Sequence, residues 1–287
     1  MAAAPAKAPP VPLLWKVSGR GAQLYLLGSF HALRADDYPV ADEVQRAFDA
    51  SGRLLFELSP QEVDGPELAA RMRQVAQRRD GSTLRGELDA ATWRRLQAYA
   101  PPHGLSLEAM QGLKLWSVAL SVSLAEMGRQ GLAADAGLDR HFMDLAARRQ
   151  LPVEGLERAA DQIELLDGMA PEEQRQLLDE ALDDAGDGQQ VRDLHDAWRR
   201  GDTRALWSQM ALAMRKDYPA LYRRINVERN DRWVPLLERR LQAGQGTTLV
   251  VVGALHLLGE DGVVEKLRAR GYTVERICAA CSARGTH

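Results

Sequence analysis

Two stretches near opposite ends of the chain share one arrangement of residues. Residues 24–31 read LYLLGSFH and residues 249–256 read LVVVGALH, so each apolar run ends in a glycine, two further residues and a histidine. Apolar runs of this length are typical of buried strands, and we expect each glycine to let the chain turn sharply at the strand's carboxyl end. Sites in open α/β sheets gather beyond the carboxyl ends of strands. His31 and His256 are therefore predicted to converge on one point.

Glu57 is the third candidate, because it lies inside the apolar run of residues 54–58, LLFEL. A carboxylate in such surroundings costs free energy unless it is paired or bound to a metal ion. Two imidazoles and a carboxylate suit a divalent metal. The set predicts an open metal site formed by His31, His256 and Glu57, or a two-histidine site with Glu57 as general base. We expect ring nitrogens of the two histidines within roughly 5 Å of one another, given metal–nitrogen bonds of about 2.0–2.1 Å.

Four polar residues are candidates for supporting roles. Arg229 and Asn230 lie in a long predicted helix just before the last apolar strand. Arg229 is a candidate to hold a substrate carboxylate or an oxyanion by a charged hydrogen bond, and a salt bridge with an acidic neighbour on its own helix is the alternative. Asp139 and Glu157 are candidates to orient the histidines. Capping of a helix start is the alternative for Asp139.

These side chains need a sheet to position them, and the two ends of the chain supply its strands. Residues 12–60 read as two strands, a helix and a third strand, and residues 245–278 as a strand, a helix and a final strand. Apolar residues at helical spacing fill most of residues 61–244. We predict a single α/β domain over residues 12–278, α+β-like in its mixture of elements, whose helical region caps the site.

Glycines and prolines divide the helical region into segments. The predicted helices cover residues 68–79, 90–100, 106–128, 137–150, 171–185, 191–200, 203–215 and 218–243. Residues 151–156 interrupt this series and read as a short strand and loop.

The composition is that of an ordinary globular protein. Hydrophobic residues make up 45% and charged residues 27% of the 287 residues, which excludes a wholly disordered or fibrous chain. Lys+Arg minus Asp+Glu is 37 − 40 = −3, so nucleic acid is a poor candidate for a partner. The longest apolar stretch, residues 113–125, is shorter than the roughly 20 residues that cross a bilayer. It predicts a buried core helix and no transmembrane segment.

The two ends of the chain bear on where the protein works. Residues 1–11 read as a flexible Ala/Pro-rich leader and residues 279–287 as a tail. The leader lacks the apolar core of a signal peptide and suits the start of a mature exported protein or of a cytosolic one; we expect a periplasmic or secreted location. Cys278 and Cys281 form a C-x-x-C motif, which indicates a short disulfide in an oxidising compartment or two idle thiols otherwise.

Short motifs along residues 13–277 resemble, in their order and spacing, those of the TraB/PrgY/GumN (TraB/GumN) family. They are LWKVSG at 14–19, LLGSFH at 26–31, FE at 56–57, LKLW at 113–116, GLD at 137–139, PVEGLE at 152–157, ERN at 228–230 and VGALHL at 252–257. Where the family usually has G-T-x-H, this chain has Ser29, which keeps the hydroxyl group. Ser29 therefore joins the supporting candidates.

The resemblance implies a metal-dependent, hydrolase-like fold with the two G-x-x-H histidines and the glutamate at the site. The family is related to the Tiki metalloproteases, whose activity is proteolysis with manganese or cobalt, and more distantly to the erythromycin esterases. We therefore expect a peptidase that uses a metal-bound water, with manganese, cobalt or zinc as cofactor and a peptide or small molecule as substrate. The alternatives are a protein that sequesters a peptide or small ligand without turnover, and an esterase.

Overall fold

The computed structural model describes residues 8–19, 21–186, 188–244 and 246–282. Outside these ranges lie residues 1–7 of the predicted leader, Arg20 in the first predicted turn and residues 283–287 of the predicted tail.

The described end of the leader is attached to the domain. The backbone N–H of Val11 donates to the carbonyl of Arg199 at 2.8 Å, and the Arg199 side chain donates to the carbonyl of Ala8 at 2.8 Å. Residues 8–11 of the predicted leader are thus hydrogen-bonded to Arg199.

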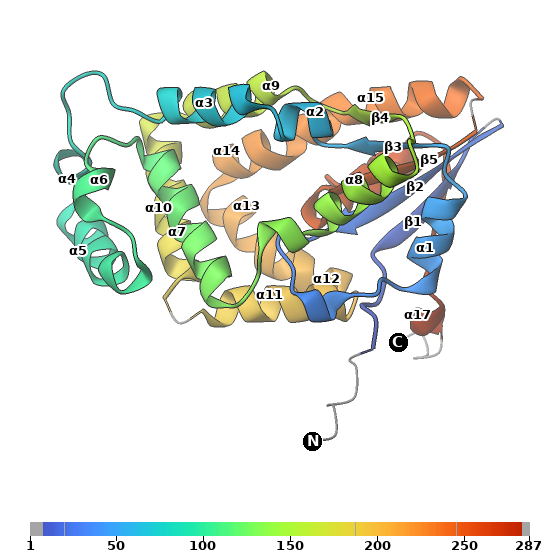
Figure 1. Cartoon of the computed structure of the whole chain (residues 1–287), viewed down its shortest axis with the longest axis horizontal. Coiled ribbons are helices and arrows are strands. Elements are labelled where there is room, and N and C mark those ends of the chain that lie inside the picture. The colour runs from blue at the N-terminus through green and yellow to red at the C-terminus, as the bar shows by residue number, and fades with distance from the viewer. Residues whose placement is uncertain (1–7, 20, 187, 245, 283–287) are drawn as a thin grey trace.

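One mixed sheet lies at the centre of the part of the chain that the structure describes (Figure 1). Its strands are β1 (Leu14–Ser18), β2 (Ala22–Ser29), β3 (Arg53–Phe56), β4 (Val153–Gly155), β5 (Gly246–Gly253) and β6 (Thr273–Arg276). Their order across the sheet is β4-β3-β5-β2-β1-β6. β2 and β5 are parallel, and β3 is parallel to both β5 and β4, whereas β1 is antiparallel to β2 and β6. The predicted α/β fold is confirmed.

The edge strand β4 confirms the short strand predicted within residues 151–156, but the sequence predicts a sheet built from the two ends of the chain alone. β4 lies within residues 61–244, the region expected to be helical, yet it pairs with β3 so that Gly155 lies opposite Phe56. The N–H of Leu54 continues the pairing by donating to the carbonyl of Pro152 at 3.0 Å. The sheet is thus built from three parts of the chain, because β3 offers an unpaired edge that the short strand between two helices can fill.

The four parallel neighbours β4, β3, β5 and β2 place their carboxyl ends on one edge of the sheet. Just beyond these ends lie, in the same order across the sheet, Glu157, Glu57, His256 and His31. The predicted gathering of polar residues at this edge follows from the strand order alone.

Helices surround the sheet and fill the middle of the chain. The α-helices are α1 (Asp42–Asp49), α2 (Pro60–Val63), α3 (Pro66–Val75), α4 (Leu84–Glu87), α5 (Ala90–Tyr99), α6 (Leu107–Met110), α7 (Leu115–Arg129), α8 (Leu138–Arg148), α9 (Ala159–Asp167), α10 (Pro171–Asp184), α11 (Gln189–Arg199), α12 (Thr203–Trp207), α13 (Ala213–Asp217), α14 (Pro219–Tyr222), α15 (Glu228–Gln242), α16 (Val263–Ala269) and α17 (Ala279–Ser282). Short 3₁₀ turns are η1 (Ala35–Asp37), η2 (Pro101–His103), η3 (Ala134–Ala136) and η6 (Ala254–Leu257), and η4 (Ser208–Leu212) and η5 (Arg223–Val227) are π-helical.

Three predicted helices are divided in the structure. Residues 106–128 form α6 and α7 separately, because Leu113 between them pairs in an isolated bridge with Gln77. The helix predicted over residues 203–215 contains the π-helical turn η4 between α12 and α13. The helix predicted over residues 218–243 contains the π-helical turn η5 between α14 and α15. Such turns widen a helix locally and are frequent at functional sites.

Two apolar clusters hold the helices in place. The larger joins the sheet to α1, α8, α15 and α16 and includes the fully buried Phe142 and Trp233; α1 and α8 lie in front of the sheet in Figure 1. The smaller joins α4, α5, α7 and α10 around Leu96 and Leu178. This helical part lies at the left of Figure 1, beyond the carboxyl ends of the parallel strands. The predicted helical middle region is confirmed.

The longest apolar stretch of the sequence forms core structure. It corresponds to α7, where Trp116 and Val118 are buried, as predicted. None of the described helices is long and apolar enough to span a bilayer. Near the end of the described chain, Cys278 and Cys281 form a disulfide, the first of the two alternatives that the C-x-x-C motif allows.

Candidate active site

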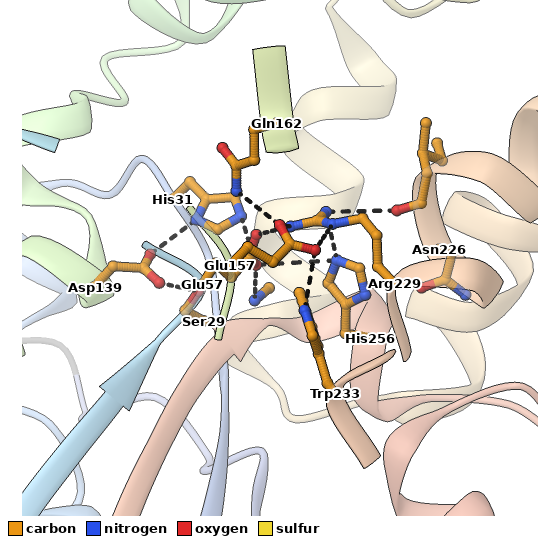
Figure 2. Close-up of polar contacts among 12 residues, drawn as sticks. Ser29, His31, Glu57, Asp139, Glu157, Gln162, Asn226, Arg229, Trp233 and His256 are labelled. Carbon is orange, nitrogen blue, oxygen red and sulfur yellow. Dashed lines mark hydrogen bonds and ion pairs between the residues drawn. The ribbon is translucent and has the colours of Figure 1, made fainter. Parts of the chain in front are cut away.

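The candidate site lies at the carboxyl edge of the four parallel strands (Figure 2). Glu57 follows β3 directly, and the backbone N–H of Gly253, at the end of β5, donates to its Oε1 atom at 2.8 Å. The Nε2 atom of His31 lies 3.8 Å from that oxygen, and the Nε2 atom of His256 lies 4.0 Å from it. The structure therefore brings the three principal candidates together around one carboxylate oxygen.

The glycines of the two G-x-x-H motifs provide close contact, and neither has a left-handed backbone. The expected turn is found at Gly253, which ends β5 and leads into the 3₁₀ turn η6, but not at Gly28, which lies inside β2. A Cβ atom on Gly253 would lie 3.0 Å from His31 Nε2 and 3.3 Å from Glu57 Oε1. A Cβ atom on Gly28 would lie 3.1 Å from the Cβ of Leu13. At Gly253 the missing side chain is what leaves room for the site.

His31 is oriented by a carboxylate and a hydroxyl group. Its Nδ1 atom lies 2.9 Å from Oδ2 of Asp139, and the Ser29 hydroxyl donates to Oδ1 of the same carboxylate at 2.9 Å. Because an ionised carboxylate only accepts hydrogen bonds, Nδ1 carries a proton and Nε2 is turned toward Glu57. Asp139 thus acts on a strand-end histidine, and this contact differs from the helix capping that its sequence position also allowed. The side chain of His31 is 60% exposed, so solvent and ligands can reach it.

Gly137 sets how closely α8 approaches His31. A Cβ atom on Gly137 would lie only 2.2 Å from the carbonyl oxygen of His31. The N–H of Leu138 donates to the carbonyl of Phe30 at 3.2 Å. Glycine is therefore required at this position. The close contact that it allows places Asp139 beside His31.

His256 is buried, and an asparagine fixes its tautomer. Its Nδ1 atom lies 2.8 Å from Oδ1 of Asn230, whose amide nitrogen donates to the carbonyl of Asp261 at 2.8 Å. Because the amide nitrogen is used in this way, the amide oxygen faces His256. Nδ1 therefore carries the proton and Nε2 keeps an unshared electron pair. Asn226, one helical turn before Asn230, extends the network to the hydroxyl of Tyr222 at 3.2 Å.

Arg229 lies in the middle of the site and joins its residues (Figure 2). Its Nε and Nη2 atoms each lie 2.9 Å from an oxygen of Glu157, Nη2 lies 2.5 Å from Oε2 of Glu57, and Nη1 lies 3.0 Å from Nε2 of His256. Its partners come from strand ends and a loop, not from acidic neighbours on α15. Glu157 contacts Arg229 and the indole N–H of Trp233, and it hydrogen-bonds neither histidine. Glu157 therefore orients the arginine.

The charges of these groups are set by their neighbours. Burial raises the pKa of Glu57, but the Arg229 guanidinium, the two histidines and the backbone N–H of Gly253 together outweigh burial and hold this pKa well below its usual range. Burial lowers the pKa of His256 to about 3, so its imidazole is neutral. The Asp139 carboxylate raises the pKa of His31 to about 9. The site thus combines an ionised carboxylate, a neutral imidazole and an imidazole that readily takes up a proton.

The donor atoms are of the kinds that a divalent ion uses, but the described side chains are not grouped as a metal site. Two ligands that each bind an ion at about 2.1 Å lie at most about 4.2 Å apart, and both Nε2–Oε1 distances to Glu57 are within this limit. Both histidines have Nδ1 bonded to an acceptor, as metal-binding histidines usually do. Nη1 of Arg229 stands beside His256 where an ion would bind.

A cavity of about 380 Å³ opens beside His31 and Glu57. The other lining residues are Phe56, Leu58, Val63, Ala134, Asp135, Asp139, Arg140, Met143 and Gln162. The cavity has the size of a small-ligand pocket, with apolar walls and a few polar groups.

Comparison with known proteins identifies the family. A model of the TraB/PrgY/gumN family matches residues 13–276, which include every described strand and all of the predicted site residues. The chain belongs to the TraB/PrgY/gumN family. It is 25% identical over 251 residues to the uncharacterized protein YbaP of Escherichia coli (strain K12), across 85% of this chain and 87% of that protein. Uncharacterized protein YbaP of Shigella flexneri matches to the same extent. No solved structure matches the chain.

In this member of the TraB/PrgY/gumN family, three residues contribute to the site although the sequence patterns indicate no role or a weak one for them. Gly137 belongs to the GLD motif, whose glycine was a signal for a close backbone contact. Trp233 lies four residues after Arg229, and that spacing puts both on one helix face; the guanidinium lies 4.8 Å from the indole centre. Gln162 lies on α9 and donates to Glu157 at 3.3 Å.

Proposed function

We propose that this member of the TraB/PrgY/gumN family is a metal-dependent hydrolase, with a peptide as its substrate. The observation that carries the proposal is that both histidines turn Nε2 toward one oxygen of Glu57 while each Nδ1 atom is fixed by an acceptor. His31, His256 and Glu57 would hold a manganese, cobalt or zinc ion. Such an ion supplies a Lewis acid and lowers the pKa of a bound water molecule.

Glu57 suits the role of ligand better than that of general base. Its carboxylate accepts hydrogen bonds from the backbone of Gly253 and from Arg229. Both bonds favour the ionised form, which makes the carboxylate a weak base near neutral pH. An ionised carboxylate that is already fixed in place is, in contrast, suited to hold a cation.

Arg229 suits the stabilisation of negative charge that develops on a substrate oxygen. The side chain is 11% exposed, so a charged hydrogen bond from it would be weakened little by water. Ser29 with Asp139 would hold His31, and Asn230 would hold His256, in the required orientations. The cavity beside His31 would receive part of the substrate. The relationship to the Tiki metalloproteases that the family resemblance implies favours a peptide over an ester.

The experiment is to measure the metal content of the purified protein and then its action on a mixed peptide library and a panel of esters, with and without Mn²⁺, Co²⁺ or Zn²⁺. We expect peptide cleavage that requires a metal ion and is lost in His256→Gln. His103→Gln is the matched control, since His103 stacks on Tyr99 in the helical region. Cleavage of esters alone would favour an esterase, and a protein that binds metal but cleaves neither class would refute a hydrolase.

A non-catalytic binding role is the second candidate, and the position of Arg229 favours it. A cleft whose carboxylate and imidazole already pair with an arginine can hold a peptide without recruiting a metal ion. Capture of peptides from the same library by the metal-free protein, with no cleavage under any metal condition, would select this role.

A further inference from the structure

The guanidinium of Arg229 lies between Glu57 and His256 and contacts the His256 nitrogen that a metal ion would bind. Nη2 contacts Oε2 of Glu57 at 2.5 Å, and Nη1 contacts Nε2 of His256 at 3.0 Å. Because the Nδ1 proton of His256 is directed at Asn230, its Nε2 atom has the electron pair that accepts this bond. The same electron pair would bind a metal ion, so Arg229 and the ion cannot both use it.

The surrounding charge explains why a cation must be present in the metal-free protein. The side chains of Glu57 and Glu157 are only 13% and 4% exposed, and Arg229 bridges them. Two nearby carboxylates that are this buried would repel one another and lose solvation if no cation stood between them. Arg229 supplies that charge from within the chain.

Glu157 gives the guanidinium a second anchor that is independent of the metal ligands. Two bonds of 2.9 Å join Glu157 to Nε and Nη2 of Arg229. The indole N–H of Trp233 donates to Glu157 at 3.0 Å, and the amide of Gln162 donates at 3.3 Å. Because this anchor is held by other residues, Arg229 can leave Glu57 and His256 and still keep its charge paired.

We propose that Arg229 is an internal cation that competes with the divalent metal ion. In the metal-free protein it pairs with Glu57 and His256, and a metal ion that binds these two residues displaces it onto Glu157 alone. The inference rests on the proposed function, because it assumes that a metal ion binds here. Its consequence is that Arg229 lowers the metal affinity of the site while it keeps the empty site ordered.

The test measures binding of Mn²⁺ and of Zn²⁺ by calorimetry to the metal-free full-length chain. Arg229→Met removes the competing cation, and we expect it to bind the metal ion about 10-fold more tightly than the wild type, or more. Changes to residues around a metal site commonly alter metal affinity by about 10-fold to 100-fold. We also expect a lower melting temperature without metal and a larger rise on adding it than in the wild type. Arg232→Met is the matched control, because Arg232 lies on the same helix, 54% exposed and 3.7 Å from Glu157. It should change affinity by less than about 3-fold.

Equal or weaker metal binding by Arg229→Met than by the wild type would overturn the inference alone, because the site would still bind metal. An equal gain in Arg232→Met would also overturn it, since the effect would then be one of net charge. Absence of binding to both the wild type and Arg229→Met would overturn the inference together with the metal site of the proposed function. If Arg229→Met does not fold, Arg229→Lys is the second test, because the lysine ammonium cannot contact all three partners of Arg229 at once. We expect Arg229→Lys to bind the metal ion more tightly than the wild type. An unchanged metal affinity in this variant would refute competition.

Discussion

At the scale of single residues, the site is a series of groups whose charges depend on one another. Asp139 contacts His31, His31 lies near Glu57, and Arg229 bridges Glu57 to Glu157. Most of these side chains are largely buried, so each charge is compensated by a neighbour more than by water. Removing one member therefore leaves its neighbour without compensation, which costs stability as well as function.

Glu57→Gln should lower the free energy of unfolding, although glutamine has almost the same shape. The change removes the charge that faces Arg229, and breaking a buried ion pair costs several kcal/mol. Because Arg229 keeps Glu157, we expect a smaller loss, of about 2 kcal/mol, in urea denaturation. Glu154→Gln is the control, since Glu154 is 45% exposed and pairs with Arg240 at the surface; it should cost less than about 1 kcal/mol. Equal losses in the two variants would contradict the buried pair.

The sequence could identify some of these residues because their signal is local. The histidines repeat in one motif at two strand ends, and Glu57 stands out as a charge within an apolar run. The contacts of Arg229 could not be predicted in this way. Its partner Glu57 is 172 positions away, and no spacing along the chain indicates which helix face will meet which strand end. Long-range partners depend on the packing of whole elements.

At the scale of elements, small residues decide how closely helices and strands approach the site. Gly253 leaves room for His31 and Glu57 at the end of β5, and Gly137 lets the start of α8 touch the backbone of His31. Neither has the positive φ angle that would mark a turn glycine. At both positions the missing side chain leaves space for a close contact between elements, which a turn prediction from the sequence does not reveal.

Gly137→Ala should destabilise the fold and separate Asp139 from His31. The added Cβ would meet the His31 carbonyl at 2.2 Å, so α8 must shift, and overpacking of this kind costs about 1–3 kcal/mol. Gly128→Ala is the matched control. Gly128 lies inside α7 with nothing within 4 Å of the added atom, and it should gain up to about 1 kcal/mol from helix propensity. Thermal unfolding of both variants tests the contrast; no loss in Gly137→Ala would refute the close contact.

The positions of the strands could be predicted from the sequence better than the pairing between them. Alternating and apolar runs indicate β1, β2, β3 and β5, because the periodicity of a strand depends on its own residues. The pairing of β4 with β3 depends, in contrast, on a segment far along the chain. The same holds for the break between α6 and α7, where a bridge to Gln77 interrupts an apparently continuous helical pattern.

A buried ion pair joins η1, shortly after His31, to α11, and it should make stability depend on acid. Asp37 contacts His195 and Arg199. Burial raises the pKa of Asp37, but the hydrogen bond from His195, with others, outweighs it and lowers the pKa from 3.8 to about 2. The folded state therefore favours the ionised form, so its stabilisation is complete above pH 3.8 and is lost as pH falls toward 2.

The shift corresponds to about 2 kcal/mol, and Asp37→Asn should remove it. We expect the variant to be less stable than the wild type at pH 5, and the difference in unfolding free energy to narrow by about 2 kcal/mol between pH 5 and pH 2. Urea denaturation at several pH values measures this. A difference that stays constant over that interval would show that Asp37 titrates alike in the folded and unfolded chain.

At the scale of the whole molecule, the site is assembled from segments far apart in the sequence. β2 and β5 are neighbours in the sheet although more than two hundred residues separate them, and β4, α8 and α15 enter from the middle of the chain. The helical part around Leu178 has an apolar cluster of its own. The sheet cluster, however, contains residues of α8 and α15, so the middle of the chain and its two ends share one core.

This shared core predicts how the folded protein responds to limited proteolysis. The region 61–244 supplies Phe142 and Trp233, both fully buried against the sheet, and truncating such residues typically costs about 3–5 kcal/mol. A middle fragment would lose all of these contacts at once, and the sheet would lose β4. We therefore expect that early cuts fall in exposed loops and that the nicked pieces stay associated in size-exclusion chromatography under native conditions, separating only in denaturant. Mass spectrometry of the separated peaks identifies the pieces. Release of a stable fragment close to 61–244, with the two ends still folded together, would instead establish two domains.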